Sequence, residues 1–166
     1  MPVAVVLLLI ACTGAPADFP SPQSPAGYPL RILATDLSSA TEEPFSVGAA
    51  TNQDDYDELW QRIGGTPPPL AVNFERQVVL FLGMAGSSSC PERFAGLAID
   101  ATSRVYAEWA PQPPNRPCTD DLAPQGTLLA VARSALPAEP FLLSLRDQPI
   151  CPDCADHPDQ LVVDPR

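Results

Sequence analysis

The sequence predicts a mainly β (α+β) fold, in which a single small antiparallel β-sheet or sandwich domain carries one amphipathic helix. Three observations support this. The chain has 166 residues, enough for one domain with a real hydrophobic core, and 45% of them are apolar. Between residues 30 and 147, short apolar segments alternate with Gly, Pro and Ser, which is the pattern of strands and turns. One clear stretch, residues 52–63, has the period of an amphipathic helix.

The strands are expected on both sides of this helix. Two short candidates precede it, at residues 31–35 and 44–49. Five follow it, at residues 77–84, 94–100, 105–110, 127–132 and 141–146. The short connections favour an antiparallel meander over a core, with the helix covering one face or an open end. Three aromatic side chains are predicted to lie in that core: Phe94, Trp109 and Phe141.

The helix carries signals at both of its ends. Asn52 is the predicted N-cap, and Asp54 and Asp55 in the first turn complement the positive end of the helix dipole. Gly64-Gly65 and the prolines after them end the helix. One apolar stripe runs between these ends, at Tyr56, Leu59, Trp60 and Ile63. The acidic residues of the first turns lack the pattern of a calcium loop, so a capped, solvated helix start is expected.

The first residues are expected to form an export signal. Residues 3–11 are an unbroken apolar run, whose helical length of about 14 Å is too short for a hydrocarbon core of about 30 Å. Small residues follow it. Leu9-Ile10-Ala11-Cys12 resembles the bacterial lipobox, in which cleavage precedes the cysteine and its sulfur receives a diacylglyceryl group. The resemblance implies a signal peptide over residues 1–11 and lipidation of Cys12.

The following segment, residues 12–28, is rich in Pro, Ala, Ser and Gly and is predicted to be a disordered tether. Acyl chains on Cys12 would anchor the chain to the cell membrane on its extracytoplasmic face. Met1-Pro2 contains no basic residue, so the basic segment of a signal peptide is expected upstream, unless the amino terminus serves alone.

The remaining cysteines number four, and they are Cys90, Cys118, Cys151 and Cys154. An even number in an exported chain favours disulfides, for which three connectivities exist. We expect Cys90–Cys118 and Cys151–Cys154. In a meander, the loops after the first and third of the five strands lie at the same end, which makes the first bond feasible. The fifth strand exits toward the same end, so a swapped pairing remains open.

The acidic tail, residues 149–166, offers one alternative to a disulfide. Cys151-x-x-Cys154-x-x-His157 has the spacing of zinc ligands, although the acidic, proline-containing surroundings show no sign of a folded knuckle. A redox-active pair lacks the strand–helix context that frames such motifs. No metal and no cofactor is therefore expected.

The charge balance excludes several classes of function. Nine basic residues, all arginine, stand against 20 acidic ones, giving a net charge of −11 that argues against nucleic-acid binding. The chain has no lysine and one histidine, which leaves little room for lysine or triad chemistry. Ser87-Ser88-Ser89 is thus expected to be a flexible loop instead of a nucleophile. Asp120-Asp121 is expected to be a pair of surface turn residues.

Four motifs carry a further resemblance. They are Asp57-Glu58-Leu59-Trp60, Pro67-Pro68-Pro69, Val72-Asn73-Phe74 and Val78-Val79-Leu80-Phe81-Leu82-Gly83. They resemble the PrcB C-terminal family of protease-complex-stabilising lipoproteins over residues 43–145. Asn73 stands where that family has aspartate, and residues 85–91 replace its Gly-Gly-Tyr segment. The resemblance implies that residues 29–148 form a β-rich domain that contacts a protease or other envelope protein.

Two functions are consistent with these observations. The first is a non-enzymatic, membrane-anchored module that binds or stabilises another envelope protein through the loops of Cys90 and Cys118. The alternative is a carboxylate-dependent envelope hydrolase acting on cell-wall glycan. That chemistry needs two carboxylates about 5–9 Å apart across a cleft, and no acidic pair here is flanked by aromatic residues suited to sugar stacking. The oligomeric state is left open.

Overall fold

The computed structural model describes residues 29–35, 37, 45–65, 70–112, 115–146 and 159–166. Within these residues it contains eight strands, one α-helix and one short 3-10 helix. In chain order they are β1 (Leu30–Ala34), β2 (Ser46–Ala50), α1 (Gln53–Arg62), β3 (Gln77–Gly86), β4 (Phe94–Ile99), β5 (Val105–Trp109), β6 (Ala123–Ala132), η1 (Arg133–Ala135), β7 (Phe141–Ser144) and β8 (Gln160–Val163).

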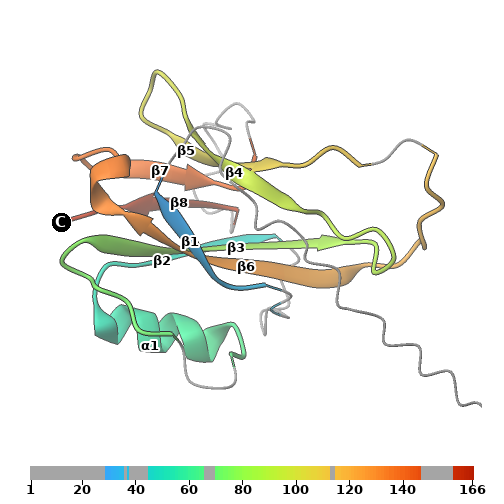
Figure 1. Cartoon of the computed structure of the whole chain (residues 1–166), viewed down its shortest axis with the longest axis horizontal. Helices are drawn as coiled ribbons and strands as arrows, with labels where there is room; N and C mark the ends of the chain where they lie inside the picture. Colours follow the sequence, from blue (N-terminus) through green and yellow to red (C-terminus); the bar gives the residue numbers. More distant parts are fainter. Residues whose placement is uncertain (1–28, 36, 38–44, 66–69, 113–114, 147–158) are drawn as a thin grey trace, which may run out of the picture.

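The strands form two four-stranded sheets that pack as a sandwich. The first has the order β1-β6-β3-β2 and the second the order β4-β5-β7-β8. Figure 1 shows the two sheets stacked, with α1 against the outer face of the first. The predicted fold class, a small β sandwich with one helix, is confirmed. So is the position of the helix over one face.

The predicted meander is wrong. β3 lies between β2 and β6 and pairs with both. Its pairing with β6 extends over ten positions, from Gln77↔Ala132 to Gly86↔Ala123. β4 and β5 belong to the other sheet, where β5 pairs in parallel with β7. The physical reason lies in β3, whose apolar side chains need cover on both faces, and only an interior position in a covered sheet supplies it.

Both faces of β3 are in fact buried. Val78, Leu80 and Leu82 point into the core between the two sheets. Val79 and Phe81 point to the other side and pack under α1. Burial of each such side chain stabilises the fold by roughly 1.5–3 kcal/mol. This explains why the segment is a continuous apolar run without the alternation of a half-exposed strand.

The ring of Phe81 lies over two glycines that face each other across β3 and β6. Gly83 and Gly126 are register partners. A Cβ atom would stand 2.8 Å from the Phe81 ring at Gly83 and 2.7 Å from it at Gly126. The absence of side chains at this pair therefore makes room for the aromatic ring.

The predicted ends of α1 are confirmed. The Asn52 side-chain oxygen accepts the Asp55 N–H at 2.9 Å, as an N-cap does. At the other end Gly64 has φ 67° and donates to Gln61, while Gly65 donates to the Trp60 carbonyl at 3.0 Å. This is the Schellman arrangement, which satisfies carbonyls left free in the last turn.

The apolar stripe of α1 faces the first sheet, also as predicted. Tyr56, Leu59 and Ile63 are buried, and Trp60 is partly buried beside them. The Tyr56 hydroxyl donates to the Leu70 carbonyl at 3.3 Å, and burial raises the pKa of Tyr56. The helix is thus packed on the sheet through this apolar stripe.

The three predicted core aromatics lie in or beside the core between the sheets. Phe94 and Phe141 are buried, and Trp109 is partly buried against them. The rings of Phe94 and Trp109 meet edge to face with centroids 6.1 Å apart. The Trp109 indole N–H donates to the Leu145 carbonyl at 2.9 Å, which ties β5 to the end of β7.

The strand β8 was not expected. Its residues were assigned to the acidic tail, yet they pair with β7 from Phe141↔Val163 to Ser144↔Gln160. The short run Leu161-Val162-Val163 has strand propensity, but only Val163 is fully buried. Pairing with β7, which the sequence does not reveal, gives the strand its place in the sheet.

No helix in the described ranges combines the length and apolar character needed to cross a membrane. The predicted signal peptide, the predicted tether and residues 149–158 of the predicted tail lie outside the described residues.

Candidate functional site

The predicted Cys90–Cys118 disulfide is present. It joins residues 28 apart in sequence, with their Cα atoms 5.5 Å from each other. Cys90 follows β3, and Cys118 lies between β5 and β6. The two loops meet because the β4–β5 hairpin returns the chain, with Phe94 opposite Trp109. We call residues 87–93 and 115–122 the disulfide loops.

The serine segment in these loops is not the free loop that the sequence indicated. The Ser87 and Thr119 hydroxyls lie 2.9 Å apart, and the Thr119 N–H donates to the Ser89 hydroxyl at 2.8 Å. Ser87 and Cys90 also form an isolated β-bridge. The disulfide brings Thr119 next to the serines, and their hydroxyls then hold one another in place.

Asp121 closes this hydrogen-bonded cluster. Its carboxylate accepts from the Thr119 hydroxyl and from the Ser88 N–H, the latter at 3.2 Å. These bonds, the Thr119 side chain first, lower the pKa of Asp121. A carboxyl group whose pKa is lowered is ionised at neutral pH and is a poor general acid. The cluster therefore orders the loops and does not resemble an acid–base pair.

Gln125, at the start of β6, connects the first of these loops, residues 87–93, to the sheet. Its side-chain oxygen accepts the Glu92 N–H at 2.9 Å, and its amide donates to the Ser87 carbonyl at 3.3 Å. Leu122 stands beside this fixed framework with 79% of its surface exposed.

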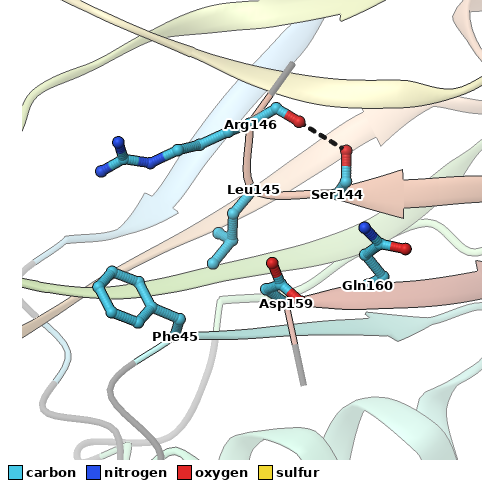
Figure 2. Close-up of a pocket in the computed structure, with 6 residues that line it drawn as sticks. All are labelled: Phe45, Ser144, Leu145, Arg146, Asp159 and Gln160. Atoms are coloured by element: carbon cyan, nitrogen blue, oxygen red, sulfur yellow. Dashed lines mark hydrogen bonds between the residues drawn. The ribbon is translucent and has the colours of Figure 1, made fainter. Parts of the chain in front are cut away.

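A pocket of about 300 Å³ opens where the edge strands β2 and β8 meet. Figure 2 shows the residues that line it: Phe45, Ser144, Leu145, Arg146, Asp159 and Gln160. We call it the end pocket. It lies at the same end of the sandwich as the disulfide loops, because β2 begins opposite Gly83, close to the end of β3 at Gly86.

One polar atom in the end pocket is unusual. Oδ1 of Asp159 is buried and has no hydrogen-bond partner among the residues that the structure describes. By contrast, the Ser144 hydroxyl donates to the Arg146 carbonyl at 3.0 Å. Figure 2 shows the Arg146 side chain extending away from Asp159. The pocket is thus lined by a carboxylate whose Oδ1 atom receives no hydrogen bond from the described residues.

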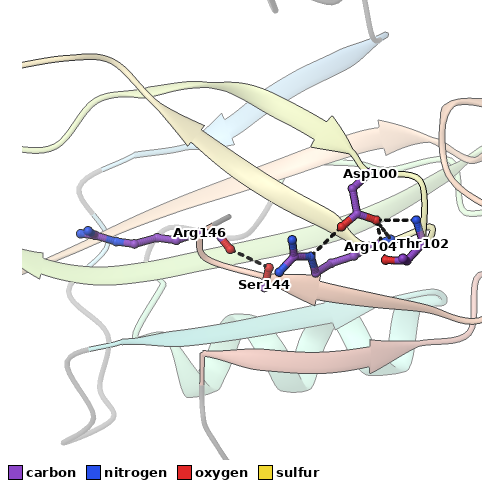
Figure 3. A network of polar contacts seen from close by, with 5 residues as sticks. All are labelled: Asp100, Thr102, Arg104, Ser144 and Arg146. Carbon is purple, nitrogen blue, oxygen red and sulfur yellow. Dashed lines mark hydrogen bonds and ion pairs between the residues drawn. The ribbon is translucent and has the colours of Figure 1, made fainter. Parts of the chain in front are cut away.

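The opposite end of the sandwich holds a different aspartate. Asp100 lies in the β4–β5 turn and accepts from the Thr102 N–H at 2.8 Å, the Thr102 hydroxyl at 2.6 Å and the Arg104 N–H at 3.1 Å. Its other oxygen accepts from Arg104 Nε at 3.0 Å (Figure 3). These bonds, the Thr102 hydroxyl first, lower the pKa of Asp100 to about 2. Its carboxylate is committed to the turn.

The described part of the chain contains no group of three or more residues placed to hold a metal ion. Cys12, Cys151, Cys154 and His157 lie outside the described residues. Lipidation of Cys12, the second disulfide and the zinc alternative therefore stay predictions. The end pocket has a single carboxylate, Asp159, among its described lining residues, whereas glycoside hydrolysis uses a pair.

The motifs that suggested a family have structural roles where they are described. Phe74 packs against Tyr56 with ring centroids 5.7 Å apart, and Val72 packs in the same cluster. The Asn73 side-chain oxygen accepts the Glu75 N–H at 3.0 Å, as an aspartate carboxylate in its place would. Pro67-Pro68-Pro69 lies outside the described residues.

Sequence reasoning singled out the cysteines and missed the end pocket. Asp159 and Gln160 follow a stretch assigned to a tail, and Phe45 precedes a short strand. The apolar run after Gln160 was the one signal that could have revealed β8. Comparison of the chain with protein-family models, with curated proteins and with solved structures found no match.

Proposed function

We propose that this protein is a membrane-anchored, extracytoplasmic lipoprotein whose β domain is a non-enzymatic module that binds or stabilises another envelope protein. The observation that carries the proposal is the surface formed by the disulfide loops. That surface combines a covalent crosslink, a cluster of side-chain hydrogen bonds and an exposed Leu122.

The ordering of these loops supports a role in binding. A loop that is already held in one conformation loses less entropy when a partner docks on it. Leu122 provides apolar area, and the ionised Asp121 beside it provides negative charge. With a net charge of −11, the domain favours a partner with a basic surface.

The proposed compartment rests on two independent features. Disulfides persist mainly in oxidising environments outside the cytoplasm, and Cys90–Cys118 joins two distant segments. The Leu9-Ile10-Ala11-Cys12 motif supports attachment through Cys12. Two acyl chains hold a protein at a bilayer, whereas one chain binds only marginally.

The resemblance to the PrcB C-terminal family suggests the kind of partner. A lipoprotein of this type would hold an envelope protease or a similar complex near the membrane. Residues 85–91, which differ from that family, form part of the disulfide loops, so the contact would be specific to this chain.

A photo-crosslinking amino acid at position 122 tests the binding surface in intact cells. We expect one partner protein to be captured from position 122. The matched control is position 70, since Leu70 is also an exposed leucine, at 52%, but lies beside α1. Equal capture from both positions, or capture of no protein, would contradict the proposal.

Mass spectrometry of the chain extracted from membranes tests the anchor. We expect an acylated N-terminus at Cys12, and release of Cys12→Ser into the soluble extracytoplasmic fraction. A native chain that keeps its first eleven residues and carries no fatty acid would overturn this part of the proposal.

A further inference from the structure

We propose that the end pocket binds the ammonium group of a lysine side chain supplied by the partner protein. This inference rests on the proposed function, and it identifies what the module recognises. The site is built from Asp159, with Phe45, Leu145 and Gln160 around it.

The recognition group is the Asp159 carboxylate. Its Oδ1 atom is shielded from solvent and receives no hydrogen bond within the described structure. A buried carboxylate oxygen without a donor is costly, so a turn of the partly exposed Asp159 side chain that brings this oxygen to a cation in the pocket recovers free energy that the described residues do not supply. Asp100 shows the contrast, because its two oxygens receive four hydrogen bonds.

The other lining residues suit the rest of a lysine side chain. Phe45, which is 39% exposed, and Leu145 offer apolar surface to a four-carbon stem. Gln160 adds an amide oxygen as a second acceptor. A volume of about 300 Å³ is at the lower end for ligand pockets and fits one side chain better than a large cofactor.

The ammonium group has to come from another molecule. This chain has no lysine, and all nine of its arginines belong to the described residues. Arg146, the arginine nearest in the pocket lining, extends away from Asp159 in Figure 2. The net charge of −11 attracts cationic partners to the domain as a whole.

The position of the end pocket connects it to the disulfide loops. Both lie at the end of the sandwich where β3 finishes and β2 begins. Trp109 donates to the Leu145 carbonyl and packs on Phe94, just after the disulfide loops. A partner that contacts Leu122 therefore faces the same end of the sandwich as the pocket.

NMR titration of the ¹⁵N-labelled full chain with Nα-acetyl-lysine amide tests the site. We expect saturable shifts at the backbone amides of Leu145 and Gln160. The uncharged Nα-acetyl-norleucine amide should leave them unchanged. Absence of saturable shifts, or equal shifts with both probes, would overturn the proposal.

Variants decide whether Asp159 is the acceptor. Asp159→Asn should weaken lysine-amide binding by about tenfold or more, because a charged hydrogen bond is lost. Asp120→Asn makes the same charge change at an exposed residue of the disulfide loops and should bind like the wild type. Unchanged affinity in Asp159→Asn would overturn the assignment. Should that variant not fold, Phe45→Ala replaces it, with a severalfold weaker affinity expected.

Two further outcomes separate this proposal from others. Binding of cadaverine without binding of the capped lysine would overturn the assignment to a protein side chain in favour of a free amine. Crosslinking at position 122 that persists when no lysine binding is found would overturn the pocket and leave the proposed function intact. Lysine binding without any crosslinked partner would overturn the proposed function and leave the pocket assignment intact.

Discussion

The two ends of this sandwich are held together by different kinds of contact. At the hairpin end, Asp100 bonds to Thr102 and Arg104, which are two and four residues away. At the other end the partners lie far apart in sequence. Ser89 and Thr119 are 30 residues apart, and Cys90 is bonded to Cys118 across 28.

This difference parallels the proposed division between a structural end and a recognition end. The hairpin turn satisfies its own carboxylate with donors that the local sequence provides. The disulfide end is assembled from several distant segments, and it leaves Asp159 Oδ1 unpaired within the described residues and Leu122 exposed. Binding sites often lie on loops that a rigid scaffold positions, and this end has that character.

The largest predicted effect concerns β3, the central strand of the first sheet. Phe81→Ala removes a ring that is 2% exposed and packs beneath α1, so it should lower the free energy of unfolding by about 3–5 kcal/mol. Urea unfolding measures it. Leu122→Ala, at an exposed position, should change stability by no more than about 0.5 kcal/mol. Similar losses of unfolding free energy in the two variants would contradict the placement of Phe81 in the core and of Leu122 at the surface.

The second effect distinguishes the two ends directly. Replacing both Cys90 and Cys118 by serine should cost about 3.5 kcal/mol, the loop-closure value for a crosslink of this span. Hydrogen exchange should become faster at the disulfide loops and stay unchanged at the β4–β5 turn. Equal acceleration at both ends would show that they are not independent.

A smaller effect is predicted within the disulfide loops. Thr119→Val keeps the shape of the side chain but removes the hydroxyl that bonds to Ser87 and Ser89, at a cost of about 1 kcal/mol. The same change should raise the pKa of Asp121, because the Thr119 hydroxyl is the main cause of its lowering. A carboxyl NMR titration measures the pKa of Asp121. An unchanged pKa in Thr119→Val would contradict the hydrogen bond between Thr119 and Asp121.

The smallest effect concerns the hairpin end and depends on pH. Folding lowers the pKa of Asp100 to about 2, from an ordinary value of about 3.9, so ionisation of Asp100 favours the folded state. That stabilisation is complete above about pH 5 and is lost as the pH falls through the folded pKa of about 2. Urea unfolding of wild type and Asp100→Asn should therefore differ most at neutral pH and converge below about pH 2. A difference in stability that stays constant with pH would contradict the lowered pKa of Asp100 in this turn.

Much of the fold was predictable because its signals are local. The cap at Asn52, the glycines after α1 and the stripe at Tyr56 and Leu59 act over a few residues. The first disulfide was also predicted correctly. Its supporting argument was partly wrong, since the strands do not form a meander; the β4–β5 hairpin brings the two loops together.

The sequence by itself determined the helix, the apolar central strand and the cysteines available for a crosslink, because side-chain periodicity and capping are set by near neighbours. Only the tertiary structure decided that β5 pairs in parallel with β7, that β8 completes the second sheet, and that Asp159 faces a pocket. The physical reason is that periodicity indicates which side chains a strand buries and leaves its neighbour unspecified. That choice depends on the packing of the whole core.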